Sequence, residues 1–405
     1  MSKNYAKDFI NNDFNFNQAA FVKSVYYDLK KDQDINEDLY DGLFAKNDKI
    51  KNLVIAHHSD LDGYCSAAVI LYELESIYHN KLKWTKDINF STVSINYEDD
   101  LKRKLSKFIN EDELDSTEIW FVDFSFSSDE NKYYLEKLVF GPYELTPVVV
   151  WIDHHVTSVE WRKESDILAK GLPGLVVDYK LSGAALTWLY IRYITDSTYE
   201  SIPNFLQYVS DYDTWSKHCE DVDSFKSGAD YNWPKLQNLI ENGMLNREWR
   251  YALDWKQSPS VVKRYIIDGD CVKMGIEVAN RKMVARTGAL YTIYLPWDKE
   301  TKYGVFVVNG IGNSSVFGDI IDDPHIAFTC LFSYSSKAKK YIYSFYSTKD
   351  EYDMSEIAHR LGGGGHRGAA GCQLTFNMFE LAKSNKDSDL ALNFNDVLVR
   401  MNTGG

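Results

Sequence analysis

An acid and two histidines close an apolar stretch of the chain, and residues of these types bind divalent metal ions. Residues 147–152 are apolar and rich in valine, and Asp153, His154 and His155 follow directly. Such a run predicts a buried parallel strand whose polar end emerges at the carboxyl edge of a sheet, where open α/β sheets bind their ligands. Carboxylates and neutral imidazoles are ligands for Mn, Fe, Co or Zn. Taken alone, three polar residues after a strand are more often a cap or a solvated turn.

The same pattern recurs elsewhere in the chain. Apolar strands are expected at 53–56, 118–122 and 206–209, and each runs into acids. Residues two apart in an extended loop point the same way, so the imidazole and acids that follow the first strand can face one centre. Each acid could instead cap the next helix, but four such strand ends in one sheet are hard to attribute to capping. Two hard metal ions such as Mn²⁺ would use the whole set: His58, Asp60, Asp62, Asp123, His154 and Asp211.

The elements that must position these residues alternate between strand and helix. Apolar helices are expected at 66–78 and 183–194, and this alternation implies right-handed crossovers and a mostly parallel sheet. A helical insertion is expected at 219–256. Beyond it the strands predicted from the pattern lie at 290–295, 304–309, 326–334 and 341–347. The expected organisation is α/β, with a helical arm at 1–50 (helices at 19–31 and 37–44), a catalytic domain at 51–257, a linker helix at 258–286 and a smaller domain at 287–405.

A second candidate site is the glycine-rich segment 362–371, which follows a short predicted helix. Asp353 and Glu356 have the capping-box spacing for the start of that helix. Four consecutive glycines cannot be a helix interior, and their N–H groups can cradle an anion. His366 and Arg367 would add charge-assisted hydrogen bonds to phosphate. A flexible hairpin or a helix stop is the plainer alternative.

Composition limits the substrates and the surroundings. The 405 residues are 44% hydrophobic and carry a formal net charge of -14, which argues against an extended basic surface for long duplex DNA. Short anionic substrates stay possible, because metal ions can supply the positive charge. The five cysteines form no Cys-x-x-Cys pair and are expected to be reduced, buried thiols in a cytoplasmic protein without a zinc ribbon. No apolar run approaches the ~20 residues of a membrane helix.

Taken together, these motifs resemble the DHH phosphoesterase superfamily, named for the triplet seen here at 153–155. The resemblance covers the motifs from His58 to Asp211 and continues into the family's associated C-terminal domain, whose signature resembles 362–371. It is closest to the NrnB-like nanoRNases, with the RecJ exonucleases more distant. It implies a mostly parallel-sheet domain joined by a helix to a smaller mixed-sheet α/β domain, with the active site in the cleft between them.

The resemblance also implies a role for each candidate residue. One Mn²⁺ would be held by His58, Asp60 and Asp123, and a second by Asp62, Asp123, His154 and Asp211, with Mg or Co as possible substitutes. Asp213 follows the same predicted strand as Asp211 and could exchange roles with it. Asp153 would orient a histidine, His155 would contact phosphate or donate a proton, and His57 would be structural. The residues implied to bind substrate phosphate are Gly364, Gly365, His366 and Arg367.

The function implied by the resemblance is hydrolysis of short single-stranded oligonucleotides to nucleoside monophosphates. The alternatives are a cyclic nucleotide or dinucleotide phosphodiesterase, a phosphatase for 3′-phosphoadenosine 5′-phosphate, a RecJ-like exonuclease, which would need a basic track, and an inactive nucleotide-binding scaffold. One departure concerns an arginine that relatives often carry at the strand near 343–347, for which Tyr346 or Lys349 could substitute. Tyr346 and Phe317 could stack bases. A monomer or homodimer with no membrane partner is expected.

Overall fold

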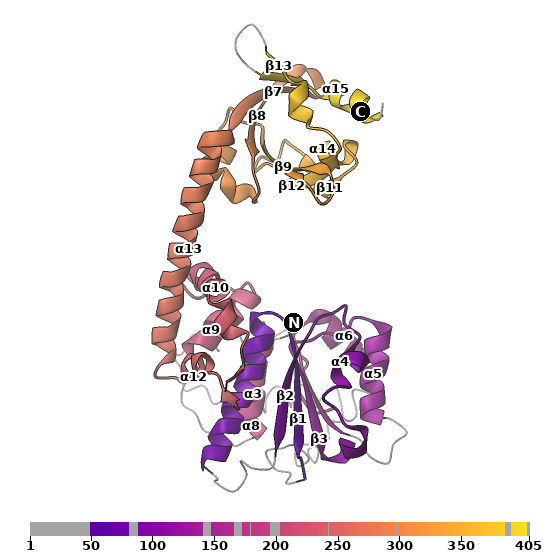
Figure 1. The fold of residues 1–405 in the computed structure, drawn as a ribbon, viewed down its shortest axis with the longest axis vertical. Helices are drawn as coiled ribbons and strands as arrows, with labels where there is room; N and C mark the ends of the chain where they lie inside the picture. The colour runs from indigo at the N-terminus through magenta and orange to yellow at the C-terminus, as the bar shows by residue number, and fades with distance from the viewer. Residues whose placement is uncertain are drawn as a thin grey trace. The chain divides into compact units, whose positions relative to one another are not determined.

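The protein consists of two compact units, residues 1–272 and 273–405 (Figure 1). The computed structural model describes residues 49–80, 88–140, 147–165, 172–178, 180–194, 203–241, 243–295, 298–384 and 390–402. The predicted helical arm, with its helices at 19–31 and 37–44, therefore lies almost entirely outside the described residues. Each unit is described by itself.

The first unit is built on a four-stranded parallel sheet in the order β2-β1-β3-β4. Three of its strands are confirmed predictions, whereas β2 was not predicted because its sequence, Asn-Phe-Ser-Thr-Val-Ser-Ile, is largely polar and suits its place at an edge of the sheet. The strands are β1 (Asn52–His58), β2 (Asn89–Ile95), β3 (Thr117–Val122) and β4 (Val148–Ile152).

Helices cover both faces of this sheet, which explains why its central strands are largely apolar. On one face, Ile55 and Trp120 join the hydrophobic core that includes α3 and α8. On the other face, Val54 and Phe121 pack with residues of α4 and α5. The helices are α3 (Leu61–Asn80), α4 (Leu101–Leu105), η2 (Glu111–Ser116), α5 (Asp129–Phe140), α6 (Val156–Glu164) and α8 (Gly183–Ile194).

The strand predicted at 206–209 is wrong, because these residues belong to helix α9 (Asn204–Asp213). Phe205, Leu206 and Val209 are buried, and their spacing of one and four residues marks one face of a helix. A short apolar run does not by itself distinguish a strand from a buried helix. The acids at 211 and 213 therefore lie at the end of a helix.

The region at 219–256 is helical, as predicted, with one short hairpin. It contains α10 (Val222–Tyr231), α11 (Trp233–Leu236), β5 (Ile240–Glu241), β6 (Met244–Leu245) and α12 (Arg247–Leu253). The long helix predicted at 258–286 is confirmed as α13 (Ser258–Thr287), and the boundary between the two units falls within it, after Val272.

The second unit is a mixed eight-stranded sheet in the order β11-β12-β10-β9-β8-β7-β14-β13. Asp353 caps the short helix α14 by accepting hydrogen bonds from the N–H groups of Ser355 and Glu356, as its position predicts. Together the units confirm the predicted α/β class. The elements are β7 (Ala289–Leu295), β8 (Asp298–Asn309), η3 (Ser314–Val316), η4 (Gly318–Asp322), β9 (Phe328–Ser335), β10 (Lys340–Tyr346), α14 (Met354–Arg360), β11 (Gly364–His366), β12 (Ala369–Leu374), η5 (Met378–Leu381), β13 (Lys383–Ser384), β14 (Leu390–Asn393) and α15 (Phe394–Asn402).

The cysteines are all free thiols, and three of them, Cys65, Cys330 and Cys372, are buried as predicted. Cys271 is exposed and Cys219 is half-buried, so the prediction of burial is wrong for Cys271. Within the described part of the chain, no helix has both the length and the apolar character needed to span a membrane.

Candidate active site

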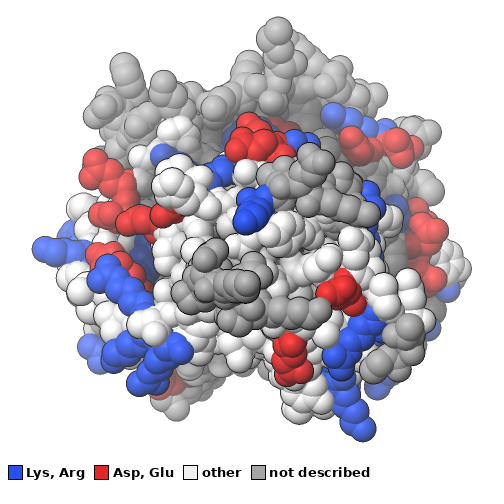
Figure 2. Space-filling view, turned by 90° about the horizontal axis from the view of Figure 1, so that it is seen from above, with Lys and Arg blue, Asp and Glu red and all other residues white. Residues whose placement is uncertain are grey.

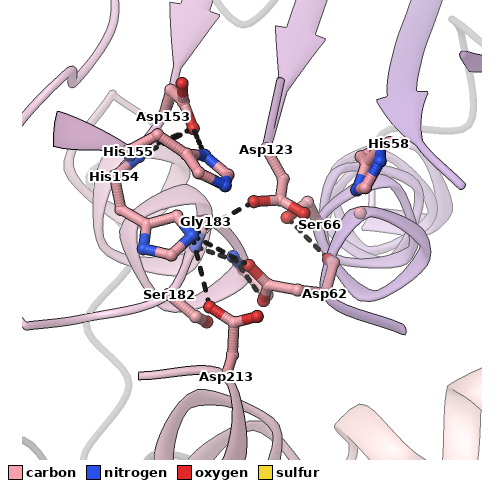
Figure 3. A network of polar contacts seen from close by, with 12 residues as sticks. His58, Asp62, Ser66, Asp123, Asp153, His154, His155, Ser182, Gly183 and Asp213 are labelled. Carbon is pink, nitrogen blue, oxygen red and sulfur yellow. Dashed lines mark hydrogen bonds and ion pairs between the residues drawn. The ribbon is translucent and has the colours of Figure 1, made fainter. Parts of the chain in front are cut away.

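The polar residues that follow β1, β3 and β4 meet at the carboxyl edge of the first sheet (Figure 3). His58 is the last residue of β1, Asp123 follows β3, and His154 lies two residues after β4. His154 Nε2 lies 3.4 Å from Asp123 Oδ1, and His58 Nδ1 lies 2.9 Å from Asp60 Oδ2. Parallel strands bring their carboxyl ends to one edge, and this geometry assembles His58, Asp123 and His154, which are 31 to 96 positions apart in the chain.

Asp62, in the first turn of α3, is held against the start of α8. The backbone N–H groups of Gly183 and Ala184 donate to its two carboxylate oxygens at 2.7 and 3.1 Å (Figure 3). Position 183 must be glycine, because a Cβ there would lie 2.7 Å from the Cβ of Asp123. The helix α8, correctly predicted from its apolar sequence, therefore fixes two acids of the site.

Asp123 lies at the centre of the cluster and is strained, buried and unsatisfied. Its φ of 53° lies in the left-handed region, which is costly for a residue with a side chain. It is 1% exposed, and neither carboxylate oxygen has a hydrogen-bond partner. Burial, and then the negative charges of Asp62 and Asp60, raise the pKa of Asp123 well above its usual range. Cations at this position would satisfy both the charge and the orphaned oxygens.

Asp123, Asp153, His154 and His155 form one group that could hold a metal ion, and two further groups lie beside it. In one of these, ligand atoms of His58, Asp60 and Asp123 lie within 4.8 Å of one another. In the other, atoms of Asp62, His154 and Asp213 do so. Burial lowers the pKa of His154, which keeps its imidazole neutral and able to bind a metal. The donor set, carboxylates and imidazoles with no thiolate, fits hard or borderline divalent cations.

Asp213 and not Asp211 faces this cluster. The Oδ2 atom of Asp213 lies 3.2 Å from His154 Nε2 and has no hydrogen-bond partner. Burial and the charges of Asp62 and Asp60 raise the pKa of Asp213 to about 8. The carboxylate of Asp211 accepts backbone hydrogen bonds from His218 and Cys219 instead, both at 2.8 Å. The geometry therefore favours Asp213 over Asp211 as the metal ligand, which is the alternative that the sequence left open.

Asp153 and His155 form a hydrogen-bonded pair beside the cluster. His155 Nδ1 lies 2.7 Å from Asp153 Oδ1, and the N–H of His154 donates to the same oxygen at 2.9 Å. Burial lowers the pKa of His155, but the hydrogen bond to Asp153 outweighs it and raises the pKa to about 9. His155 is therefore positively charged at neutral pH, which suits a residue that contacts phosphate.

Tyr97 is a site residue that the sequence did not reveal. It follows the unpredicted strand β2; its hydroxyl lies 3.4 Å from His155 Nε2, and its ring packs on His58 with centroids 4.8 Å apart. A prediction of strand β2 would have identified Tyr97 as a candidate, because Asn96 and Tyr97 are the polar residues that follow that strand. His57, predicted to be structural, is buried, and burial lowers its pKa to about 4.

The glycine-rich segment is a helix stop followed by a tight hairpin. The N–H of Gly362 (φ 74°) donates to His359 O at 3.0 Å and that of Gly363 to Ala358 O at 2.8 Å, which is the Schellman ending of α14. A Cβ on Gly363 would lie 2.0 Å from Gly371 O, and one on Gly365 would lie 2.5 Å from Ala370 Cα. A Cβ on Gly364 would meet nothing within 4 Å. Packing therefore explains three of the four glycines and leaves Gly364 without a structural reason.

The polar residues of this hairpin are exposed, whereas the two aromatic residues predicted to stack bases, Tyr346 and Phe317, are more buried. His366 is exposed at the end of the edge strand β11, and Arg367 donates from Nε to Asp350 O at 3.1 Å. Lys349 Nζ donates to Asp323 O at 2.6 Å, so its ammonium group is bound within the second unit. Phe317 is 2% exposed, so it belongs to a hydrophobic core and is not available to stack bases. Tyr346 is half-buried against Phe317.

No protein-family model matches the sequence. It is 23% identical over 335 residues to oligoribonuclease NrnB of Bacillus subtilis, an alignment that covers 80% of this chain and 73% of that protein. The predicted resemblance to the NrnB-like nanoRNases is confirmed over most of the chain. The chain is also 24% identical over 324 residues to uncharacterized protein R106 of Acanthamoeba polyphaga mimivirus. This alignment covers 79% of this chain but only 66% of the viral protein, slightly less than two thirds of its length.

Among solved structures, the DHH domain of a member of the s1p family of ribosomal proteins aligns with 88% of this chain and 87% of its own. Its sequence identity is 14% and its TM-score is 0.44, a likeness that carries no argument about activity. The chain carries acid and histidine groups that could hold divalent metal ions.

Proposed function

We propose that the protein is a Mn²⁺-dependent phosphodiesterase that hydrolyses short oligonucleotides to nucleoside monophosphates. The observation that carries the proposal is the set of ligand groups around the buried carboxylate of Asp123, whose oxygens have no hydrogen-bond partner. The likeness to an oligoribonuclease over 80% of the chain supports the choice of substrate class. The acid and histidine cluster and the relative thus both support the proposed reaction class.

The proposed ligands of one ion are His58, Asp60 and Asp123, and those of the other are Asp62, Asp123, His154 and Asp213. Asp123 belongs to the first group and approaches His154 of the second to 3.4 Å, which suits a shared ligand. Divalent ions held there would lower the pKa of a water molecule and offset the charge of the attacked phosphate. Asp213 replaces Asp211 in this proposal because only Asp213 faces His154.

His155 is the proposed phosphate contact of the first unit. Its positive charge, maintained by Asp153, favours an anionic oxygen, and 36% exposure of its side chain leaves room for a ligand. Asp153 is fully buried and accepts from both the His155 ring and the His154 backbone, so it fixes the orientation of the imidazole. We therefore assign His155 to substrate positioning and Asp153 to positioning His155.

The hairpin 362–371 of the second unit is the proposed binding site for a further substrate phosphate. Gly364 is exposed and free of packing demands, which allows a ligand to approach the backbone. His366 and Arg367 are exposed beside it and can donate to phosphate oxygens. A cleft between the two units, closed over the substrate, stays a prediction.

The surface charge favours a short substrate. With a formal net charge of -14, the chain opposes the approach of a long polyanion. On the face drawn in Figure 2, basic and acidic side chains are interspersed among the described residues, and no continuous basic track crosses that face. A RecJ-like reaction on long single strands would need such a track.

A substrate panel tests the proposal directly. The panel contains a dinucleotide, a pentanucleotide and a long single strand, each as RNA and DNA, together with a cyclic dinucleotide, 3′-phosphoadenosine 5′-phosphate and pyrophosphate, with Mn²⁺ or with chelator. Mn²⁺-dependent release of mononucleotides that is fastest from the shortest strands is the expected result. Preference for the cyclic or long substrate would replace the proposed function, and no turnover of any substrate would reject it. A parallel panel with Asp123→Ala excludes a contaminating nuclease.

A further inference from the structure

The turn after α9 presents one large aromatic side chain to solvent. Trp215 is 71% exposed, while the nearby Asp211 is fully buried. Its φ of 54° lies in the left-handed region, which bulky residues rarely adopt, and Lys217 follows with a φ of 50°. An exposed indole on a strained backbone is unfavourable for folding alone, and strain of this kind tends to accumulate at ligand sites.

The turn is held in place by its neighbours. The buried carboxylate of Asp211 accepts hydrogen bonds from the N–H groups of His218 and Cys219, both at 2.8 Å. The backbone oxygen of Asp211 accepts from Ser216 N at 3.1 Å, and the Trp215 N–H donates to Tyr212 O at 3.2 Å. Trp215 is therefore presented by an anchored turn, and this anchoring gives Asp211 a reason to be buried that needs no metal.

The surroundings of Trp215 suit one aromatic ring that carries negative charge. Tyr212 stacks behind the indole with centroids 6.1 Å apart and an interplanar angle of 28°. The Nζ atom of Lys217 lies 5.7 Å from the indole centroid. The residues that follow the tryptophan are polar, Ser216, Lys217 and His218, so the patch is too small and too polar for a protein interface. A nucleotide combines the π-face and the phosphate that this pair of side chains can bind.

The turn also follows directly in the chain on a residue of the metal-ligand cluster. Asp213, two residues before Trp215, places its Oδ2 atom 3.2 Å from His154 Nε2 in the metal-ligand cluster. We propose that Trp215, backed by Tyr212, is a base-stacking subsite for the nucleotide next to the hydrolysed phosphate. This proposal rests on the proposed function, since it assigns a base to the substrate of the same cluster.

Substrates with and without a base test the subsite. The panel compares a dinucleotide with two analogues, each of which has an abasic ribose in one position, in the wild type, Trp215→Leu and Trp215→Phe. Trp215→Leu should raise KM for the dinucleotide roughly tenfold, the effect of losing one base stack, and should leave KM unchanged for one abasic analogue. Trp215→Phe should retain most of the affinity, which also covers the case in which the leucine variant does not fold. An equal loss on all three substrates would overturn the proposal.

A matched control is Trp255→Leu, because Trp255 is 48% exposed and lies under a lysine, with Lys256 Nζ 5.2 Å from its ring. It should behave as the wild type does.

A binding measurement separates this proposal from the proposed function. Calorimetry with adenosine monophosphate and with ribose 5-phosphate should show that only the first binds more weakly to Trp215→Leu. That result would stand even if the wild type hydrolysed no oligonucleotide, whereas equal binding of adenosine monophosphate to wild type and variant would overturn the subsite.

Discussion

The acid cluster of the first unit and the glycine hairpin of the second were both predicted as functional, yet the structure supports them differently. In the cluster, the oxygens of Asp123 are buried and unpaired, a state that costs free energy unless a cation is bound. In the hairpin, Gly362, Gly363 and Gly365 are explained by a helix ending and close backbone packing. Only Gly364 remains without a structural reason. Unsatisfied burial is thus strong support for a binding site, whereas a glycine motif must first be separated from its packing role.

The largest effect is expected from Asp123→Ala, which removes the proposed shared ligand of the two metal ions. Turnover should fall by roughly 10³-fold or more, because both metal ions lose a ligand and the charge on phosphate is less well offset. Metal affinity, measured by titration of chelated protein, should fall with it. The variant should fold, since it removes a buried unpaired charge. Asp115→Ala, at an exposed acid, is the control. Turnover near the wild-type rate would refute the cluster as the active site.

The pair Asp213→Asn and Asp211→Asn separates metal binding from the support of the turn. Asp213→Asn should weaken one metal site and lower turnover by roughly 10²-fold. Asp211→Asn should leave metal stoichiometry unchanged and mainly raise KM, because a backbone N–H of the turn loses its carboxylate partner. Metal titration and steady-state kinetics on both variants check this. Loss of a metal in Asp211→Asn, with none in Asp213→Asn, would restore the assignment made from the sequence.

His366→Ala should raise KM about tenfold with metal content unchanged, because an exposed histidine that binds phosphate contributes to affinity and not to the cluster. His359→Ala, an exposed histidine on α14, should have no effect and serves as the control. Metal analysis beside the kinetics is decisive. If His366→Ala released metal, the hairpin would belong to the cluster and not to substrate binding.

Gly364→Ala and Gly363→Ala sharpen the distinction between function and packing within the hairpin. Gly363→Ala should destabilise the fold by roughly 2–4 kcal/mol, because its Cβ would overlap the Gly371 carbonyl. Gly364→Ala should leave the melting temperature unchanged and raise KM a few-fold by blocking backbone approach. Thermal melts with kinetics on each variant give the answer. Unchanged kinetics in Gly364→Ala would leave the hairpin with a structural role only.

The smallest effect is a pH dependence of the metal-free protein. The folded-state pKa of Asp213 is about 8 against 3.8 ordinarily, and that of His155 is about 9 against 6.5. Both groups hold protons in the fold that the unfolded chain releases, so the free energy of unfolding should fall between pH 6.5 and 8. His57, with a pKa of about 4, acts in the opposite sense but mainly below pH 6.5. Melting in chelator should show a decline over this window, and Mn²⁺ should stabilise more at pH 8. A flat profile would contradict the burial of unpaired acids.

Sequence reasoning predicted the parts of the site that depend on apolar strands. The strands at β1, β3 and β4 bury both faces, so their composition marks them and their polar ends locate the cluster. The polar edge strand β2 carries no such mark, and Tyr97 was missed with it. The helix α9 was mistaken for a strand because a segment of four residues does not define a period, and this obscured which acid of 211 and 213 faces His154. Side-chain direction on a short element depends on tertiary packing, which composition does not encode.

The most direct test of the central claim is anomalous diffraction from crystals grown with Mn²⁺. Two manganese peaks are predicted at the carboxyl edge of the first sheet, one bounded by His58, Asp60 and Asp123 and the other by Asp62, Asp123, His154 and Asp213. Two peaks with Asp123 touching both would establish the metal cluster. Manganese bound elsewhere, or an ion that contacts Asp211 and leaves Asp213 free, would contradict the account.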